Sequence, residues 1–158
     1  MNPVLASGAL LLAAASPARL SFADGAWASF DRGTACEAAT RAQRIASDRS
    51  TQAHAAFAFD RSGPRHGQFA ARLGKPVAPG ATVIMTIDRQ PFLLVSRDGF
   101  AWSKGPVQES AIIAAVRTGQ YLRLEARSAT GGRFIDTYAL DGAPGAIDAA
   151  AACAVHPR

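Results

Sequence analysis

The amino-acid sequence predicts a mainly β protein, an antiparallel β-sandwich or barrel-like fold of short strands, with one helix and a short C-terminal helix. Two observations support this prediction. Short apolar stretches alternate with Gly, Pro and Asp turns along most of the chain, as in antiparallel β folds. The chain also has 158 residues, 49% of them hydrophobic, which is enough for one core, while 14 Gly and 9 Pro suit a loop-rich domain.

Period-two alternation of apolar side chains marks the individual strands. The clearest strands are predicted at residues 53–59, 67–73 and 81–87, where every second residue is apolar. Turn residues at 60–64 and 130–132 connect predicted hairpins. The remaining strands are predicted at residues 26–30, 35–39, 91–95, 100–102, 121–126 and 134–139.

One helix is predicted at about residues 107–118, and an Ala-rich segment at 146–152 predicts the short C-terminal helix. Glu109 near the start of the first helix and Arg117 near its end both favour the helix dipole. Its predicted apolar stripe consists of Ala111, Ile112, Ala115 and Val116. Large apolar residues at well-patterned positions are the candidate core anchors, namely Trp27, Trp102 and Ile112.

The N-terminus has the pattern of a signal peptide, residues 1–23. Residues 4–15 form an apolar run too short to span a bilayer, and small residues precede two cleavage positions, after Ala18 and after Ala23. No Lys or Arg precedes the run, so a buried helix or a misplaced start codon is the alternative. We expect a periplasmic or secreted protein, with residues 24–158 as one domain and no stable membrane insertion after cleavage.

Export determines how the two cysteines, Cys36 and Cys153, are interpreted. An even number of cysteines in an oxidising compartment favours a disulfide, and closing so long a loop stabilises a fold by about 4–5 kcal/mol in the chain-entropy model. The alternative is two buried thiols. Two cysteines and three scattered histidines do not form a recognisable metal-ligand pattern.

The formal net charge is +5, from 17 Lys and Arg against 12 Asp and Glu. The basic residues are spread along the chain, with one modest cluster at Arg41, Arg44 and Arg49. The interleaved aromatic residues of nucleic-acid-binding surfaces are absent from the sequence, so we expect no nucleic-acid partner. A mildly basic exported protein is expected to adhere weakly to anionic surfaces.

No residue pattern points to catalysis or to a cofactor. The sequence contains neither a Gly-x-Ser-x-Gly elbow nor a Gly-rich phosphate loop before a helix. His54, His66 and His156 are separated and are expected to be solvated or half-buried. The carboxylates are expected mainly at turns or on exposed faces: Asp88, Asp98, Glu109, Glu125, Asp136, Asp141 and Asp148.

Three segments carry a family resemblance: Ser-Arg-Asp-Gly-Phe at 96–100, Ala-Ile-Ile-Ala-Ala-Val-Arg-Thr-Gly at 111–119, and Tyr-Ala-Leu-Asp-Gly-Ala at 138–143 before an Ala-rich helix. With the signal peptide and the order of strands, the chain resembles a divergent member of the invasion-associated locus B family, small exported proteins of Gram-negative bacteria. The resemblance covers about residues 25–152. Many members have a cysteine pair around 97–100 and a cysteine beside the first Trp, which this chain lacks, while it adds Cys153. The family has no established catalytic residues to carry over.

Two functions of different classes follow. The first is an exported, non-catalytic protein that binds a protein or envelope partner, as the resemblance implies, in an undetermined oligomeric state. The second is a small periplasmic enzyme or inhibitor with an Asp/His site. A smooth surface with an apolar patch favours the first, and a pocket with close titratable groups favours the second. A hollow ligand carrier is weaker, because large residues are available to fill the barrel: Phe57, Phe69, Phe92 and Phe134.

Overall fold

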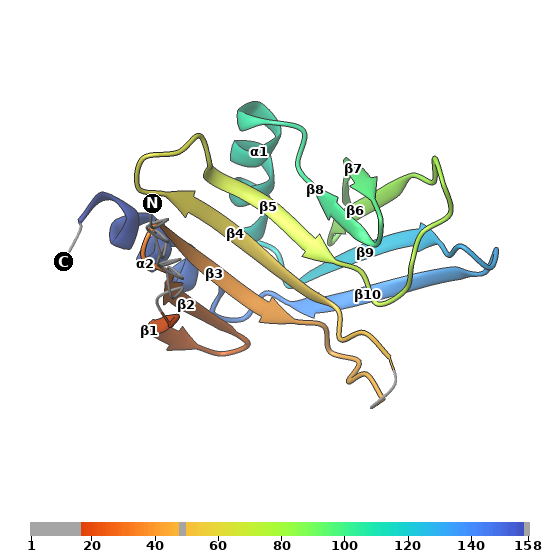
Figure 1. Ribbon diagram of the computed structural model, residues 1–158, viewed down its shortest axis with the longest axis horizontal. Coiled ribbons are helices and arrows are strands. Elements are labelled where there is room, and N and C mark those ends of the chain that lie inside the picture. The colour runs from red at the N-terminus through yellow and green to blue at the C-terminus, as the bar shows by residue number, and fades with distance from the viewer. Residues whose placement is uncertain (1–16, 48–49, 157–158) are drawn as a thin grey trace, which may run out of the picture.

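The computed structural model describes residues 17–47 and 50–156 (Figure 1), so the apolar run at 4–15 and Arg49 lie outside the described residues. The described chain forms one antiparallel sheet in the order β1-β2-β3-β4-β5-β8-β7-β6-β9-β10, and two helices, which confirms the mainly β prediction. The elements are β1 (Arg19–Asp24), β2 (Trp27–Asp31), β3 (Ala35–Arg41), β4 (His54–Asp60), β5 (His66–Arg72), β6 (Val83–Ile87), β7 (Gln90–Arg97), β8 (Phe100–Trp102), α1 (Pro106–Val116), β9 (Tyr121–Arg127), β10 (Arg133–Ala139) and α2 (Ala143–Val155).

The sheet curls so that its last strands return toward its first. The Trp27 indole on β2 donates a hydrogen bond to the Ala139 carbonyl at 2.9 Å, and the Gln43 amide donates to the Thr137 carbonyl at 2.8 Å. Strands β1 to β5, β8 and β7 are called the seven-strand half, and β6, β9 and β10 the three-strand half. Figure 1 shows β9 and β10 running at an angle to β3, β4 and β5, as in a sandwich.

The core lies between the two halves and is built from the alternating residues predicted by the strand pattern. Phe57 stands at its centre, with its ring centroid 5.9 Å from that of Trp27 and 5.3 Å from that of Phe69. The three-strand half contributes Leu122 and Leu124, which are fully buried. Each such large side chain stabilises the fold by about 1.5–3 kcal/mol, so the interior is filled rather than hollow.

Helix α1 packs on β5 and buries Ile112 and Val116, but the predicted stripe is wrong in part, because Ala111 is exposed. Glu109 joins Ile112 and Val116 on the buried side, since these residues have the i, i+3, i+7 spacing of one helical face. The expectation of an exposed Glu109 is therefore also wrong. Its carboxylate accepts a hydrogen bond from the Ser103 hydroxyl at 2.9 Å, which satisfies the buried group.

Helix α2 is longer than the predicted segment and covers the inner face of β1 to β4. It begins after Gly142, whose φ of 82° is left-handed. A Cβ atom on Gly142 would lie 1.9 Å from the Asp24 carbonyl oxygen, so only glycine fits this approach of the β1–β2 turn. The Ala26 amide also donates to the Asp141 carbonyl at 3.0 Å, which ties the two turns together.

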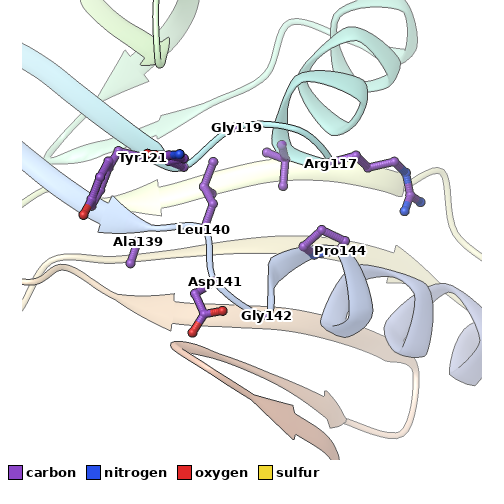
Figure 2. A pocket seen from close by; sticks show the side chains of 10 residues that line it. Arg117, Gly119, Tyr121, Ala139, Leu140, Asp141, Gly142 and Pro144 are labelled. Atoms are coloured by element: carbon purple, nitrogen blue, oxygen red, sulfur yellow. The ribbon is translucent and has the colours of Figure 1, made fainter.

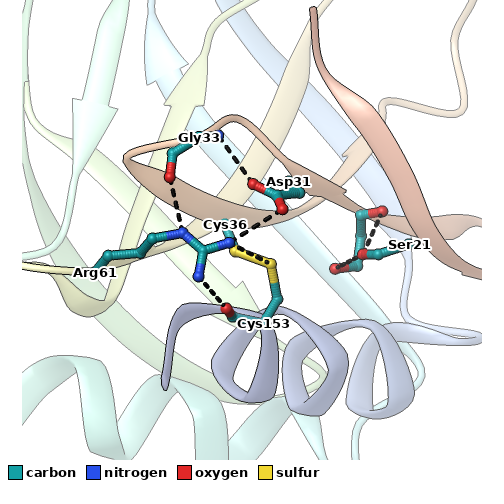
Figure 3. Close-up of polar contacts among 7 residues, drawn as sticks. Ser21, Asp31, Gly33, Cys36, Arg61 and Cys153 are labelled. Carbon is teal, nitrogen blue, oxygen red and sulfur yellow. Dashed lines mark hydrogen bonds and ion pairs between the residues drawn. A yellow bond between two sulfur atoms is a disulfide. The ribbon is translucent and has the colours of Figure 1, made fainter. Parts of the chain in front are cut away.

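Strand β1 is not predicted by the sequence pattern, because its residues overlap the segment that resembles a signal peptide. It pairs with β2, and the Ser21 hydroxyl lies 3.0 Å from the buried Ser29 hydroxyl (Figure 3). Phe22 is half-buried and packs against the core cluster next to Gly145 of α2. Strand β1 is thus part of the packed domain.

Candidate binding face

The predicted disulfide between Cys36 and Cys153 is confirmed and joins β3 to the last turn of α2 (Figure 3). Arg61, in the turn after β4, fastens the same region. Its guanidinium donates hydrogen bonds to the Gly33 carbonyl at 2.7 Å, to the Cys153 carbonyl at 2.7 Å and to the Asp31 carboxylate at 3.0 Å. The disulfide and Arg61 together hold the helix against the β2–β3 and β4–β5 turns.

This cluster does not form a metal centre. Donor atoms of Asp31, Cys36 and Cys153 lie within 4.8 Å of one another. The two sulfur atoms are bonded to each other, however, and a disulfide offers no thiolate ligand. Arg61 also holds the Asp31 carboxylate. The chemistry of this cluster is therefore structural.

Of the candidate core anchors, Trp27 and Ile112 lie in the core, with 1% and 0% of their surfaces exposed. Trp102 is half-buried instead. It stands on β8 opposite Ala70 of β5 and Val95 of β7, and these neighbours are both exposed. Directly paired residues point to the same side of a sheet, so Trp102 belongs to the outer face of the seven-strand half and not to the core.

The outer face carries a continuous line of apolar residues, here called the apolar row. Each member is paired directly with the next across adjacent strands, so the row crosses all seven strands of that half. Its members are Ala23, Ala28, Ala39, Ala56, Ala70, Trp102 and Val95. Every one of them is exposed or half-exposed.

No described element packs on this face. The residues that contact the helices point the other way, since Cys36 on β3 is bonded to α2 and Gly67 on β5 approaches Ile113 of α1. In Figure 1 neither helix crosses in front of β3, β4 or β5. No described element therefore covers the apolar row, and each of its members is at least partly exposed.

A second line of residues runs beside the apolar row, two positions along each strand, and is called the arginine row. Its members, again paired directly, are Arg41, His54, Arg72, Phe100 and Arg97. All five are exposed. Phe100 has the Arg72 guanidinium over its ring, 5.2 Å from the centroid, so this arginine is held by a cation–π contact.

A pocket of about 490 Å³ lies between the end of α1 and the β10–α2 turn (Figure 2). Its lining includes Arg117, Tyr121 and Asp141. The Arg117 guanidinium binds the Asp148 carboxylate at 2.6 Å, and Figure 2 shows Arg117 and Asp141 pointing away from each other. The pocket thus brings no acid and base within hydrogen-bonding distance.

A second pocket, of about 680 Å³, is lined by Asp60, Arg61, His66 and the end of α2. It is the place where an Asp/His site comes nearest to forming. Both Asp60 carboxylate oxygens accept hydrogen bonds from Arg65, at 2.6 to 3.0 Å, and these bonds hold the pKa of Asp60 below its ordinary value. A carboxylate so stabilised is a weak base, and no hydrogen bond joins it to His66 among the described residues.

Asp136 on β10 corrects the expectation that the carboxylates lie mainly at turns or on exposed faces, since it is only 7% exposed. It accepts a hydrogen bond from the Gly74 amide at 2.8 Å, and burial raises the pKa of its carboxyl group. Two residues further on, the Tyr138 hydroxyl is buried without a hydrogen-bond partner in the described chain, and burial raises its pKa. Both side chains lie inside the fold and cannot meet a substrate.

Sequence reasoning missed the two rows, because their members are adjacent only through strand register. One local signal points toward them. Consecutive alanines such as 38–39, 55–56 and 70–71 place a small apolar side chain on both faces of a strand, whereas an ordinary surface strand alternates apolar with polar residues.

Comparisons with protein-family models, curated proteins and solved structures found no match for this chain. The resemblance to the invasion-associated locus B family therefore rests on the sequence motifs alone. Neither helix of the described chain has the length and apolar character needed to cross a membrane.

Proposed function

We propose that this chain is an exported, non-catalytic binding protein that docks onto a protein of the bacterial envelope through the outer face of its seven-strand half. The observation that carries the proposal is the apolar row, which crosses seven strands and is covered by no described element. The resemblance to the invasion-associated locus B family points in the same direction. The pockets, by contrast, offer no acid–base pair to support an enzyme.

The dimensions of the row suit a protein interface. Strands in a sheet lie about 4.8 Å apart, so six steps span roughly 29 Å. A standard interface buries about 800 Å² on each partner, which corresponds to a patch of similar width. Alanine side chains such as Ala39 and Ala56 let a partner approach the strands closely. Trp102, the last member but one of the row, is of a residue type enriched among interface hot spots.

Export is part of the proposal, with cleavage after Ala18 rather than after Ala23. Cleavage after Ala23 would remove five of the six residues of β1, including Phe22, which packs near α2. Cleavage after Ala18 leaves β1 whole, and it also keeps Ala23 at the end of the apolar row. N-terminal sequencing of the exported protein is expected to read from Arg19. A sequence that begins at Asp24, or an uncleaved chain, contradicts this assignment.

Site-specific photo-crosslinking in exporting cells tests the binding face. A photoreactive amino acid at Ala70 is expected to yield a defined protein adduct, whereas the same amino acid at Ala114, an exposed alanine on α1, is not. Ala56→Arg is expected to abolish the Ala70 adduct, because it places a long charged side chain in the apolar row. Absence of the Ala70 adduct, equal adducts at both positions, or an adduct that survives Ala56→Arg, overturns the proposal.

A further inference from the structure

We infer that the partner presents an acidic surface, whose carboxylates lie over the arginine row when its apolar part covers the apolar row. This inference rests on the proposed function and specifies the chemistry of the partner. It follows from the charge arrangement of the outer face, where basic side chains occupy adjacent positions on three neighbouring strands.

Five arginines elsewhere in the described chain form close ion pairs with carboxylates, whereas others, such as the exposed Arg89 and Arg123, form none. The close pairs are Arg32–Glu37, Arg61–Asp31, Arg65–Asp60, Arg117–Asp148 and Arg133–Glu125. In the arginine row, Arg41 and Arg72 form no ion pair with any described residue. Arg97 has only a long contact of 3.8 Å to its neighbour Asp98, with both side chains largely exposed, which contributes little.

The arginine row also sets basic side chains directly beside one another. Arg41 is paired with His54, and His54 with Arg72, so three basic residues occupy adjacent positions on β3, β4 and β5. No acidic residue interrupts the row, so the positive charges of Arg41 and Arg72 are not balanced within it. A bound row of carboxylates balances these charges.

The two rows are placed to act together. Arg41 and Arg72 each lie two residues along the strand from Ala39 and Ala70, hence on the same face and about 7 Å away. A partner seated on the alanines therefore brings one flank over the arginines. Arg72 needs little reorganisation to receive it, because its guanidinium is already held over the Phe100 ring.

The same features favour a protein over an anionic bilayer. Membrane-surface proteins insert long apolar side chains below the head groups. Here most of the apolar row is alanine, whose methyl group is too short to reach the acyl region, and only the end near Trp102 and Val95 carries larger side chains. The surface of a folded protein can pack closely against alanine side chains, whereas a fluid lipid bilayer cannot.

The inference is tested with three designed helical peptides. All three carry the same stripe of Leu and Ala, and they differ only in the residues beside that stripe, which are Glu, Gln or Lys. The probe is the Glu peptide, titrated into isotopically labelled protein and followed by backbone amide chemical shifts. We expect shifts on β3, β4, β5 and β8, at least tenfold weaker binding by the Gln peptide, no binding by the Lys peptide, and weakening by added salt.

The double variant Arg41→Gln/Arg72→Gln is expected to weaken Glu-peptide binding at least tenfold. The control Arg89→Gln/Arg123→Gln removes the same charge from exposed residues off this face and is expected to leave binding unchanged. Equal binding of the Glu and Gln peptides, or no effect of the row variant, overturns the acidic-partner inference but leaves the proposed face intact. Lack of binding by the Glu peptide also overturns the acidic-partner inference. If the protein instead binds only phosphatidylglycerol vesicles, and does so through Arg41 and Arg72, the face is assigned to a membrane and the inference is likewise overturned.

Discussion

The inner and outer faces of the seven-strand half use the same residue for opposite purposes. Ala38, Ala55 and Ala71 point inward and are at most 2% exposed, whereas the alanine next to each in the chain points outward into the apolar row. Inside, a small side chain makes room for helices and aromatic rings. Outside, it leaves a flat surface that nothing in the described chain covers. The role of an alanine is thus set by what packs on it.

The difference between the inner and outer faces leads to a general expectation about mutations. Changes on the inner face should reduce the free energy of unfolding, because they disturb packed or hydrogen-bonded groups. Changes on the outer face should leave folding intact and affect only binding. Four predictions, ordered from the largest expected effect to the smallest, test the contrast.

Ile112→Asp is expected to unfold the domain. Ile112 is fully buried where α1 packs on the inner face, and an aspartate there would be an unpaired buried charge, which costs several kcal/mol. The measurement is thermal unfolding by circular dichroism. Val107→Asp is the control on the same helix, since Val107 is 88% exposed and should tolerate the charge. Unchanged stability of Ile112→Asp would place that stripe of α1 in solvent.

Removal of the disulfide by Cys36→Ala/Cys153→Ala is expected to lower the free energy of unfolding by about 2–5 kcal/mol, since the bond closes a loop with a sequence separation of 117. Urea unfolding of the double variant measures the loss. Thiol titration of the denatured, non-reduced parent should detect no sulfhydryl. Two reactive thiols would contradict the disulfide.

Asp136, which is buried, is expected to make the free energy of unfolding depend on pH. Because burial raises the pKa of its carboxyl group, the folded chain holds that proton more tightly than the unfolded chain. The contribution of Asp136 to stability is therefore greatest below the unfolded pKa and falls as pH rises through the folded pKa.

Asp136→Asn removes this titration and keeps an oxygen that can accept the hydrogen bond from Gly74. Relative to the parent, the variant should gain stability as pH rises from acidic to neutral, because asparagine has no charged form to bury. Urea unfolding from pH 3 to 7 measures the difference. If the free energies of unfolding of the parent and the variant change with pH in the same way, Asp136 does not contribute to the pH dependence.

Ala56→Arg is expected to change stability least, within about 0.5 kcal/mol, as for other substitutions on a surface face. The matched variant Ala55→Arg, one residue earlier and fully buried, is expected to unfold the domain. Thermal unfolding of the two variants compares the faces directly. Equal destabilisation by both would show that the outer alanines are packed rather than open.

Much of the fold was predictable from local pattern. Alternation at residues 53–59 and 67–73 corresponds to β4 and β5, and the helix expected at about 107–118 is α1, shifted by one or two residues at each end. The disulfide was predictable as well, because two cysteines admit only one intramolecular pairing. These features depend on neighbouring residues or on simple counting, which a sequence displays directly.

The candidate site was not predictable in this way. Arg41, His54 and Arg72 are far apart in the chain, and only strand register makes them neighbours. The same holds for the burial of Glu109, whose partner is the Ser103 hydroxyl, and for Trp102, which the pattern assigns to the core.

The sequence by itself determined the β class, the positions of most strands and the pairing of Cys36 with Cys153. Only the tertiary structure decided which side of each strand the helices cover, and so which alanines form a core and which form a surface. The physical reason is that side-chain alternation along a strand specifies two faces but does not say which face is buried when both are apolar.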